Sequence, residues 1–394
     1  MNSHPIKSAI ACLQVVPALE TGGAERTTID VAAALVAGGG KAFVASRGGR
    51  MVAELEAAGG HHVDLPVHSK NPVVMALNVE RLVSVIKRHQ IDIVHARSRA
   101  PAWSALAAAR RTNLPFVTTY HAKVHERPRA KVFYNSVLAR GDAVIANSAY
   151  TAERIRQIHR PDEKKLFTIP RGVNIHRLAP GAQDAGAVAA LRTSWDPRLG
   201  GPNPPCCFLL PARLTRWKGQ QLAIDAARRL KEAGSAPFVL VLLGDAQGRD
   251  AYVEELTRAI AAHGLGGDVH LGGHCDDMAT AYAAADIVLA PSIEPEPFGR
   301  VAAEAQAAAR PVIVSDTGGG KETVIADGDG RTGWRVPAGD GAALAEAMAA
   351  ALNLSAADRA AMGARGEDNA AENFSLERMC AATLDVYARL LGKN

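Results

Sequence analysis

Two glutamates, Glu296 and Glu304, lie eight positions apart around a Pro-Phe-Gly turn. The apolar run 287–293 before them is typical of a buried strand, and the alanine-rich run 301–309 is typical of a helix. Backbone N–H groups and the positive helix end favour a negatively charged ligand at such a junction. Two carboxylates placed in this way suit two hydroxyl-bearing ends of one ligand, such as a sugar and a ribose. The spacing alone more often means two solvated glutamates, so this interpretation depends on the turn and its setting.

Two cations, Arg213 and Lys218, follow another apolar strand and are five positions apart across a turn. A guanidinium fork and an ammonium point charge beside a cleft are suited to clamping a diphosphate. For an isolated Arg/Lys pair, surface charge on a loop is the more common explanation. Only together with the two glutamates does the pair indicate a diphosphate-binding site.

A glycine turn, Gly22-Gly23, follows the first strand and opens a helix, and His121 directly follows the strand 115–120. Glycines allow close backbone approach to a phosphate or a sugar, although a glycine pair alone is usually a plain tight turn. The turn is not Gly-x-Gly-x-x-Gly, so a dinucleotide-binding dehydrogenase loses its main support. The position of His121 at a strand end is where open α/β sheets place active-site residues, although a lone histidine there is more often a structural hydrogen bonder.

Two further loops carry weaker signals. Gly273 and His274 follow a strand and are suited to a nucleobase lip, although most such loops are only connections. The stretch Asp327-Gly-Asp329 looks like a metal-binding pair but lies in a polar stretch that is typical of a surface turn. With Arg213 and Lys218 supplying positive charge, we expect no metal.

The composition is that of an ordinary globular protein, with 394 residues, 48% hydrophobic and 22% charged. A chain of this length predicts two domains. No run of eighteen apolar residues occurs and the first residues lack a secretory pattern, so we expect a cytoplasmic protein. Five cysteines without metal-ligand spacing indicate reduced thiols.

The net charge of +5 is unevenly distributed along the chain. Residues 1–172 hold 24 Lys+Arg and 13 Asp+Glu, or +11, and the remaining 21 basic and 27 acidic residues give −6. A basic half suits an anionic membrane or a phosphorylated acceptor; nucleic acid is not expected, because aromatics are only 5% and no base-stacking motif occurs. One basic cluster interleaved with apolar residues predicts either a membrane-facing amphipathic helix or a solvated helix face. Its basic residues are Lys123, Arg127, Arg129, Lys131 and Arg140.

The predicted elements alternate between apolar strands and helices, which indicates α/β domains with parallel, doubly wound sheets. We expect a Rossmann-like domain over 1–172 and a second over 173–373, facing each other across a cleft. A Gly- and Pro-rich linker is predicted at about 175–206, interrupted by a helix over 185–194. The amphipathic helix in 374–394 is expected to pack back on the first domain.

The chain resembles the large family of retaining GT-B glycosyltransferases known as family 4, or glycosyl transferases group 1. The resemblance covers almost the whole chain, and its strength lies in the order of the motifs, because each motif alone is weak. In order, the matching segments are Gly22 to Glu25, His121, Asn147-Ser148, Ile169 to Asn174, Ala212 to Gly219, Leu243-Gly244, Glu296 to Glu304 and Gly318 to Gly320.

The resemblance implies a transferase that uses a nucleotide-activated sugar, UDP- or GDP-linked, without a metal or a resident cofactor. It implies that Arg213 and Lys218 neutralise the diphosphate, that Glu296 contacts the donor sugar, and that Glu304 binds the ribose. His121 is implied to contact the sugar near the reacting carbon, and the Gly22-Gly23 turn to approach the donor. On the glutamate turn, backbone N–H groups are expected to reach the sugar and the phosphates, from Phe298, Gly299, Arg300 and Val301.

We therefore expect transfer of a hexose to a glycan or lipid-linked acceptor, such as a precursor of lipopolysaccharide or a cell-surface polysaccharide. The basic half favours a protein that is peripheral on the inner face of the cytoplasmic membrane. Two alternatives remain open from the sequence: a nucleotide-sugar 2-epimerase of the same architecture, and a non-catalytic nucleotide-sugar-binding protein.

Overall fold

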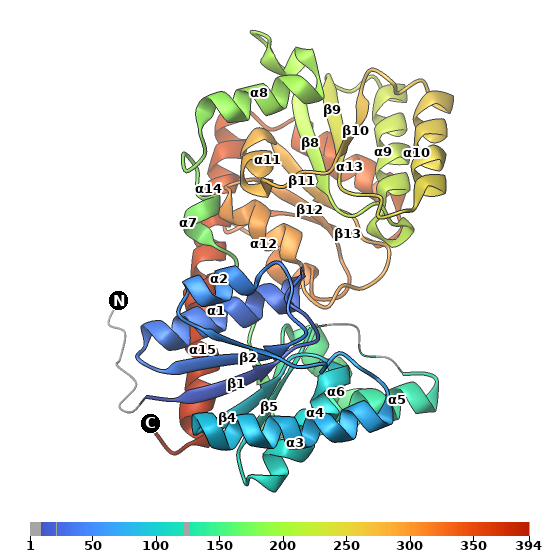
Figure 1. Ribbon diagram of the computed structural model, residues 1–394. Helices are drawn as coiled ribbons and strands as arrows, with labels where there is room; N and C mark the ends of the chain where they lie inside the picture. Colours follow the sequence, from blue (N-terminus) through green and yellow to red (C-terminus); the bar gives the residue numbers. More distant parts are fainter. Residues whose placement is uncertain (1–8, 21, 122–123, 125, 394) are drawn as a thin grey trace. The chain divides into compact units, whose positions relative to one another are not determined.

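The computed structural model describes residues 9–20, 22–121, 124 and 126–393, which form two compact units. Unit 1 comprises residues up to Gly172 together with Leu376 onward, and unit 2 comprises Val173–Ser375. Each unit is a parallel sheet with helices on both faces (Figure 1). The fold prediction of two doubly wound α/β units, with a C-terminal helix returning to the first, is confirmed.

The sheet of unit 1 has seven strands in the order β3-β2-β1-β4-β5-β6-β7. All of its neighbouring pairs are parallel, and the strand order reverses between β1 and β4. The strands are β1 (Ala11–Val15), β2 (Lys41–Ser46), β3 (His61–Asp64), β4 (Ile93–Ala96), β5 (Phe116–Tyr120), β6 (Ala143–Ala146) and β7 (Leu166–Thr168).

Successive residues of these strands point to opposite faces, so both faces carry apolar side chains. In β1, Leu13 and Val15 join the core under α3 and α4, whereas Cys12 joins the core under α1 and α15. The helices are α1 (Gly23–Ala37), α2 (Val52–Ala57), α3 (Pro72–His89), α4 (Arg99–Arg111), α5 (Arg129–Asn135), α6 (Ala149–His159) and α15 (Leu376–Leu390), with 3₁₀ turns η1 (Ser136–Ala139) and η2 (Glu163–Lys165).

The returning helix α15 is held to the sheet of unit 1 by a buried polar contact. Tyr387, fully buried on α15, lies with its hydroxyl 2.5 Å from Nδ1 of His95 on β4. The other ring nitrogen of His95 lies 2.7 Å from the hydroxyl of Thr119 on β5. Burial, with the positive charge of Arg97, holds the pKa of His95 well below its usual value, so the ring is neutral. His95 is thus a structural hydrogen bonder.

The sheet of unit 2 has six parallel strands in the order β10-β9-β8-β11-β12-β13, with its reversal between β8 and β11. Ligands of open α/β sheets bind at such switch points, outside the carboxyl ends of the strands. The strands are β8 (Cys206–Pro211), β9 (Phe238–Leu243), β10 (Val269–Gly273), β11 (Ile287–Ala290), β12 (Val312–Ser315) and β13 (Gly333–Val336).

One face of this sheet packs against α9, α10 and α13, and the other against α8, α11, α12 and α14 (Figure 1). The helices are α7 (Ile175–Leu178), α8 (Ala185–Trp195), α9 (Gln220–Glu232), α10 (Asp250–Ala262), α11 (Met278–Ala284), α12 (Arg300–Ala307), α13 (Gly341–Leu352) and α14 (Ala356–Phe374), with 3₁₀ turns η3 (Pro197–Gly200), η4 (Arg216–Lys218) and η5 (Lys321–Thr323).

The segment predicted as a Gly- and Pro-rich linker lies within unit 2, and the helix predicted inside it corresponds to α8. It contributes α7, α8 and η3 to unit 2 and buries Leu178, Trp195 and Leu199 in the core under α11 and α12. Its Gly and Pro residues keep the helices short, but the apolar residues between them still pack against one face of the unit 2 sheet. Helix α14 and strand β13 were not anticipated, since their alanine-rich or short sequences carry little periodicity.

Candidate active site

The loops that follow the strands of unit 2 are brought together at the carboxyl edge of its sheet by glycines. An added Cβ on Gly244 would lie 2.0 Å from the carbonyl oxygen of Ala212, and one on Gly219 would lie 2.2 Å from that of Pro291. Gly219 also has a φ of +82°, which favours glycine. The loops after β8, β9 and β11 are therefore packed backbone to backbone, around the switch point of the sheet.

Lys218 and Glu296 meet across this switch point, although they are far apart in the sequence. The ammonium nitrogen of Lys218 lies 2.8 Å from Oε2 of Glu296, and the two side chains are only 13% and 18% exposed. The hydroxyl of Ser292, which is buried, donates a hydrogen bond to Oε1 of the same carboxylate. Lys218 also lies over the ring of Trp217, 4.4 Å from its centroid. The structure thus places two of the predicted residues in contact, with a carboxylate whose orientation is set by Ser292.

The backbone around Glu296 is shaped by the glycine run after β12. The N–H of Gly319 donates to the carbonyl of Glu296 at 2.7 Å. An added Cβ on Gly318, whose φ is +63°, would lie 2.6 Å from the backbone of Glu296, and one on Gly319 would lie 2.4 Å from the carbonyl oxygen of Pro297. Only residues without a side chain let the two loops approach so closely. The Gly318 to Gly320 motif therefore positions the glutamate turn.

Glu304 lies inside α12 and is held by two donors. Nε of Arg300, four residues earlier, donates to Oε1 at 2.7 Å, and the hydroxyl of Tyr282 on α11 donates to Oε2 at 2.8 Å. Tyr282 is fully buried, and burial together with the charge of Glu304 raises its pKa well above the usual value. Tyr282 and Ser292 were missed at the sequence level, because nothing near them in the chain marks them as partners of a glutamate.

The remaining predicted residues of unit 2 surround this core. Arg213 is exposed, with a long 3.5 Å contact to Gln247, and its carbonyl accepts a hydrogen bond from Gln220. The ring of Phe298 is buried against Phe374 in the core, so only its backbone faces the turn. Gly299 is the residue before α12, and Val301 lies in its first turn.

The loop after β10 is connected to the same edge of the sheet. Gly273 has a φ of +67°, and its carbonyl accepts a 2.7 Å hydrogen bond from the N–H of Gly244. His274 is exposed and lies 2.9 Å from Asp276. The glycine therefore shapes the loop after β10 where it meets the loop after β9, whereas the imidazole points to an exposed acidic neighbour.

Two predicted residues of unit 1, Gly23 and His121, lie against Arg171, which belongs to the motif Ile169 to Asn174. Nη2 of Arg171 lies 2.8 Å from Nδ1 of His121, and an added Cβ on Gly23 would lie 2.2 Å from Nη1 of Arg171. Gly23 begins α1, and Gly22 precedes it with an extended backbone. Burial, then the charges of Arg171 and Arg97, hold the pKa of His121 well below its usual value. His121 is therefore a neutral imidazole at physiological pH.

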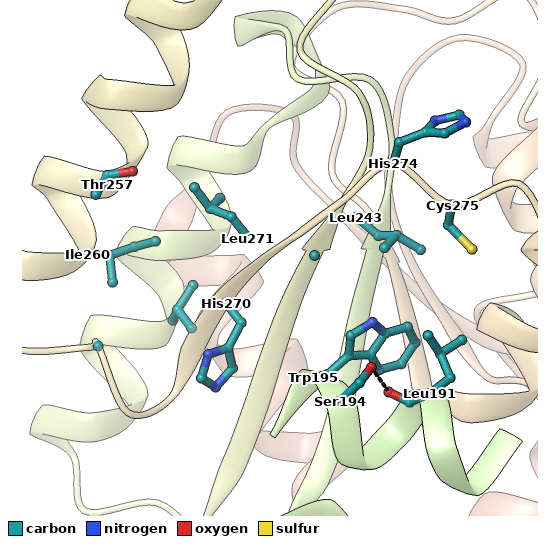
Figure 2. Close-up of a pocket in the computed structure, with 13 residues that line it drawn as sticks. Leu191, Ser194, Trp195, Leu243, Thr257, Ile260, His270, Leu271, His274 and Cys275 are labelled. Atoms are coloured by element: carbon teal, nitrogen blue, oxygen red, sulfur yellow. Dashed lines mark hydrogen bonds between the residues drawn. The ribbon is translucent and has the colours of Figure 1, made fainter. Parts of the chain in front are cut away.

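A cavity of about 540 Å³ lies elsewhere in unit 2, beside the edge strand β10. Figure 2 shows Leu191 and Trp195 of α8 on one side and Thr257 and Ile260 of α10 on the other. It touches the predicted residues only at His274, and neither Lys218 nor either glutamate lines it. Size alone does not make it the reactive centre, since the converging charged groups lie at the switch point.

Among the described residues, no helix is both long enough and apolar enough to cross a membrane. In the same residues, no three His, Cys, Asp or Glu side chains are grouped so as to hold a metal ion.

Comparisons with known proteins agree with this arrangement. Residues 21–177 match the family model described as Glycosyltransferase Family 4, and residues 192–369 match Glycosyl transferases group 1. A D-inositol 3-phosphate glycosyltransferase from Xylanimonas cellulosilytica is 32% identical over 315 residues, which cover 76% of this chain and 72% of that protein.

Solved structures also match over almost the whole chain. A glycosyltransferase from Rickettsia africae is 32% identical, with a TM-score of 0.88, and the match covers 98% of this chain and 99% of that one. The Anabaena protein HepE, solved in complex with UDP-glucose, is 23% identical, with a TM-score of 0.78 over 96% and 100% of the two chains, and it supports the fold alone. With the ordered motifs and the paired charges at the switch point, these matches show that the chain belongs to the family 4 glycosyltransferases of the GT-B fold.

Proposed function

We propose that this glycosyltransferase moves a hexose from a UDP- or GDP-linked donor to a glycan or lipid-linked acceptor, with retention of configuration and without a metal ion. The observation that carries the proposal is the contact of Lys218 with Glu296 beside the start of α12, where a cation, a carboxylate and backbone N–H groups meet. This combination suits a ligand with an anionic diphosphate and a sugar rich in hydroxyls.

Each group has a distinct proposed role. Lys218 and Arg213 neutralise the leaving diphosphate, assisted by the backbone N–H groups of Gly299, Arg300 and Val301 at the start of α12. Glu296 accepts hydrogen bonds from the sugar hydroxyls, and Glu304 accepts them from the ribose. Because Ser292 and Tyr282 already hold these carboxylates, each glutamate loses little side-chain entropy when the donor binds.

The proposed reaction requires no enzyme nucleophile. The oxygen of the acceptor hydroxyl bonds to the anomeric carbon on the face from which the diphosphate departs, and the bond from that carbon to the diphosphate breaks. The hydroxyl proton passes to the departing phosphate oxygen. Positive charge develops on the sugar and negative charge on the leaving group, so the protein contributes positioning and stabilisation of the leaving group. This differs from retaining hydrolases, in which a second carboxylate attacks the sugar.

The proposed acceptor class, precursors of lipopolysaccharide or of another cell-surface polysaccharide, draws on the surface of unit 1. Arg127, Arg129 and Lys131 are exposed at or beside α5, and Phe133 on the same helix is 63% exposed. Val73, near the start of α3, is 68% exposed. Exposed apolar and basic side chains on one unit suit an anionic membrane surface. We therefore propose that the protein acts in the cytoplasm, at the inner face of the membrane.

A donor screen tests the proposal. Thermal unfolding is measured with UDP-, GDP- and ADP-linked hexoses, because a ligand that binds only the folded state raises the apparent stability by mass action. We expect one nucleotide series to raise the unfolding temperature, and the same donor to be consumed only when an acceptor extract is added. Conversion of the donor without any acceptor would contradict transfer and indicate an epimerase. Binding without consumption under any condition would indicate a non-catalytic protein.

A further inference from the structure

Arg97 is a buried arginine for which the described residues supply no carboxylate partner. It directly follows β4, is 3% exposed, and donates from Nε to Oε1 of Gln14 at 2.6 Å. Within the described residues no carboxylate lies at ion-pair distance from it, and its Nη2 is buried without a hydrogen-bond partner. Burying an unpaired guanidinium is costly, and a fold that needed only packing would place an apolar side chain here.

His121 presents a second buried donor for which the described residues supply no partner. The guanidinium of Arg171 can only donate, so Nδ1 of His121 must accept, and the proton of the neutral ring lies on Nε2. That Nε2–H is buried, and among the described residues nothing accepts its hydrogen bond. The imidazole is therefore oriented by Arg171 and offers an N–H that nothing in the described fold uses.

The topology brings these donors to one place. Arg97 and His121 follow neighbouring parallel strands, β4 and β5, at their carboxyl ends. The turn Gly22-Gly23 follows β1, which neighbours β4 on its other side, so it flanks the same switch point of the unit 1 sheet. Arg97 and Arg171 are both close enough to depress the pKa of His121, and Gly23 leaves the space that Arg171 fills.

The groups assembled in this way are donors, and two of them carry a positive charge. A neutral sugar hydroxyl would need acceptors as well as donors, whereas a phosphate or a carboxylate offers only acceptors. We propose that Arg97, Arg171 and the Nε2–H of His121 form a binding site in unit 1 for an anionic group, a phosphate or a carboxylate, carried by the acceptor. The assignment to the acceptor rests on the proposed function, in which the diphosphate of the donor is held by Arg213 and Lys218 of unit 2.

Binding of inorganic phosphate and of UDP, measured by calorimetry on the full chain, tests the site. We expect wild-type protein to bind both. Arg171→Gln should weaken phosphate binding at least tenfold and leave UDP binding within about twofold, and Arg97→Gln should do the same where thermal unfolding shows that it folds. Because Arg171 is only partly buried, its variant keeps the test decisive if Arg97→Gln does not fold. Arg88→Gln, an exposed arginine on α3, is the control and should change neither.

Lys218→Gln should show the reverse pattern: it should weaken UDP binding and leave phosphate binding intact. In transfer assays, phosphate should compete with the acceptor and not with the nucleotide sugar. The inference is overturned if wild-type protein does not bind phosphate, if Arg171→Gln binds it as well as Arg88→Gln does, or if phosphate competes with the donor alone. Wild-type UDP binding and transfer activity in Lys218→Gln would count against the proposed function and leave the phosphate result standing.

Discussion

Lys218 and Glu296, 78 residues apart, form a 2.8 Å ion pair at the switch point of the unit 2 sheet. Both side chains are largely shielded from water, so each charge would be costly to leave without its partner. In the proposed function, the ammonium of Lys218 binds the diphosphate of the donor, and the carboxylate of Glu296 binds the hydroxyls of the donor sugar. The pair then keeps two opposite charges in position until a donor replaces both partners.

Removing the cation should primarily affect the donor phosphates. We expect Lys218→Gln to weaken binding of the nucleotide sugar about 100-fold and to lower kcat/KM by 100-fold or more, since the leaving group loses a charge-assisted contact. Calorimetric titration with the nucleotide and steady-state kinetics measure the two effects. Arg216→Gln, an exposed neighbour paired with Glu255, is the control and should have little effect. Equal activity in the two variants would rule out the proposed role of Lys218.

Removing the carboxylate of Glu296 should not weaken the binding of a free nucleotide, in contrast to removing the charge of Lys218. We expect Glu296→Gln to bind UDP or GDP as tightly as wild type or more tightly, because Lys218 no longer has a competing partner. Transfer should fall about 100-fold or more, because an amide accepts hydrogen bonds from the sugar hydroxyls less strongly. Nucleotide titration and single-turnover transfer separate the two quantities. Glu294→Gln, on the same loop, is the matched control; a parallel loss of nucleotide binding and transfer in Glu296→Gln would contradict the assignment.

Tyr282 should act through Glu304. Tyr282→Phe removes the hydroxyl that donates to Oε2 and keeps the buried ring, so the fold should persist. A hydrogen bond to a charged group contributes about 1.5–3 kcal/mol, and its loss should raise the KM for the donor about tenfold or more with a smaller change in kcat. Donor-dependence kinetics give this split. Tyr252→Phe removes another buried hydroxyl, 3.3 Å from Gln220, and serves as the control; the same rise in KM there would show a general packing effect.

The stability of the protein should fall in mild acid because the folded state disfavours protonation of two histidines. The pKa values of His95 and His121 are depressed by burial and by neighbouring positive charge. Below about pH 6.5 the unfolded chain therefore binds protons that the folded chain does not, so the free energy of unfolding decreases as pH falls from 7.5 to 5.5. Each histidine contributes at most about 1.4 kcal/mol per pH unit. His121→Gln should make this dependence shallower in thermal unfolding at several pH values; an unchanged slope would mean that His121 titrates normally.

The exposed basic residues around α5 should mediate contact with anionic membranes. Reversal of Arg127, Arg129 and Lys131 to glutamate should weaken binding to vesicles containing anionic lipid roughly 100-fold at low salt, at about 1 kcal/mol per residue near the surface. Wild-type binding should also weaken as salt is added. Vesicle co-sedimentation measures both effects. A triple reversal at Lys41, Lys87 and Arg88, which are also exposed in unit 1, is the charge-matched control; equal loss in both variants would indicate net charge and no local surface.

Many elements of the fold could be read from local patterns. Strands such as 143–146 and 287–290 are short apolar runs, and that pattern is typical of a parallel sheet that is covered on both faces. Where Gly and Pro residues interrupt the apolar pattern, the sequence does not predict which side chains are buried. The stretch 175–206 looked like a linker because its Gly and Pro residues dominate the sequence, yet Trp195 and Leu199 are buried in unit 2. Burial of these two side chains depends on α11, far along the chain.

For the candidate site too, local sequence predicts some features, and others depend on contacts between distant parts of the chain. The chemical groups of the site, and their places after strands, could be predicted from local sequence: the cations follow β8, the glutamates flank the start of α12, and His121 follows β5. Those positions follow from local periodicity and from the glycines that shape each turn. The partners of these groups emerge only once the chain is folded: Glu296 for Lys218, Tyr282 for Glu304 and Arg171 for His121. These contacts join residues 22 to 78 positions apart, and strand order, with the close approach of loops at glycines, determines which of them meet.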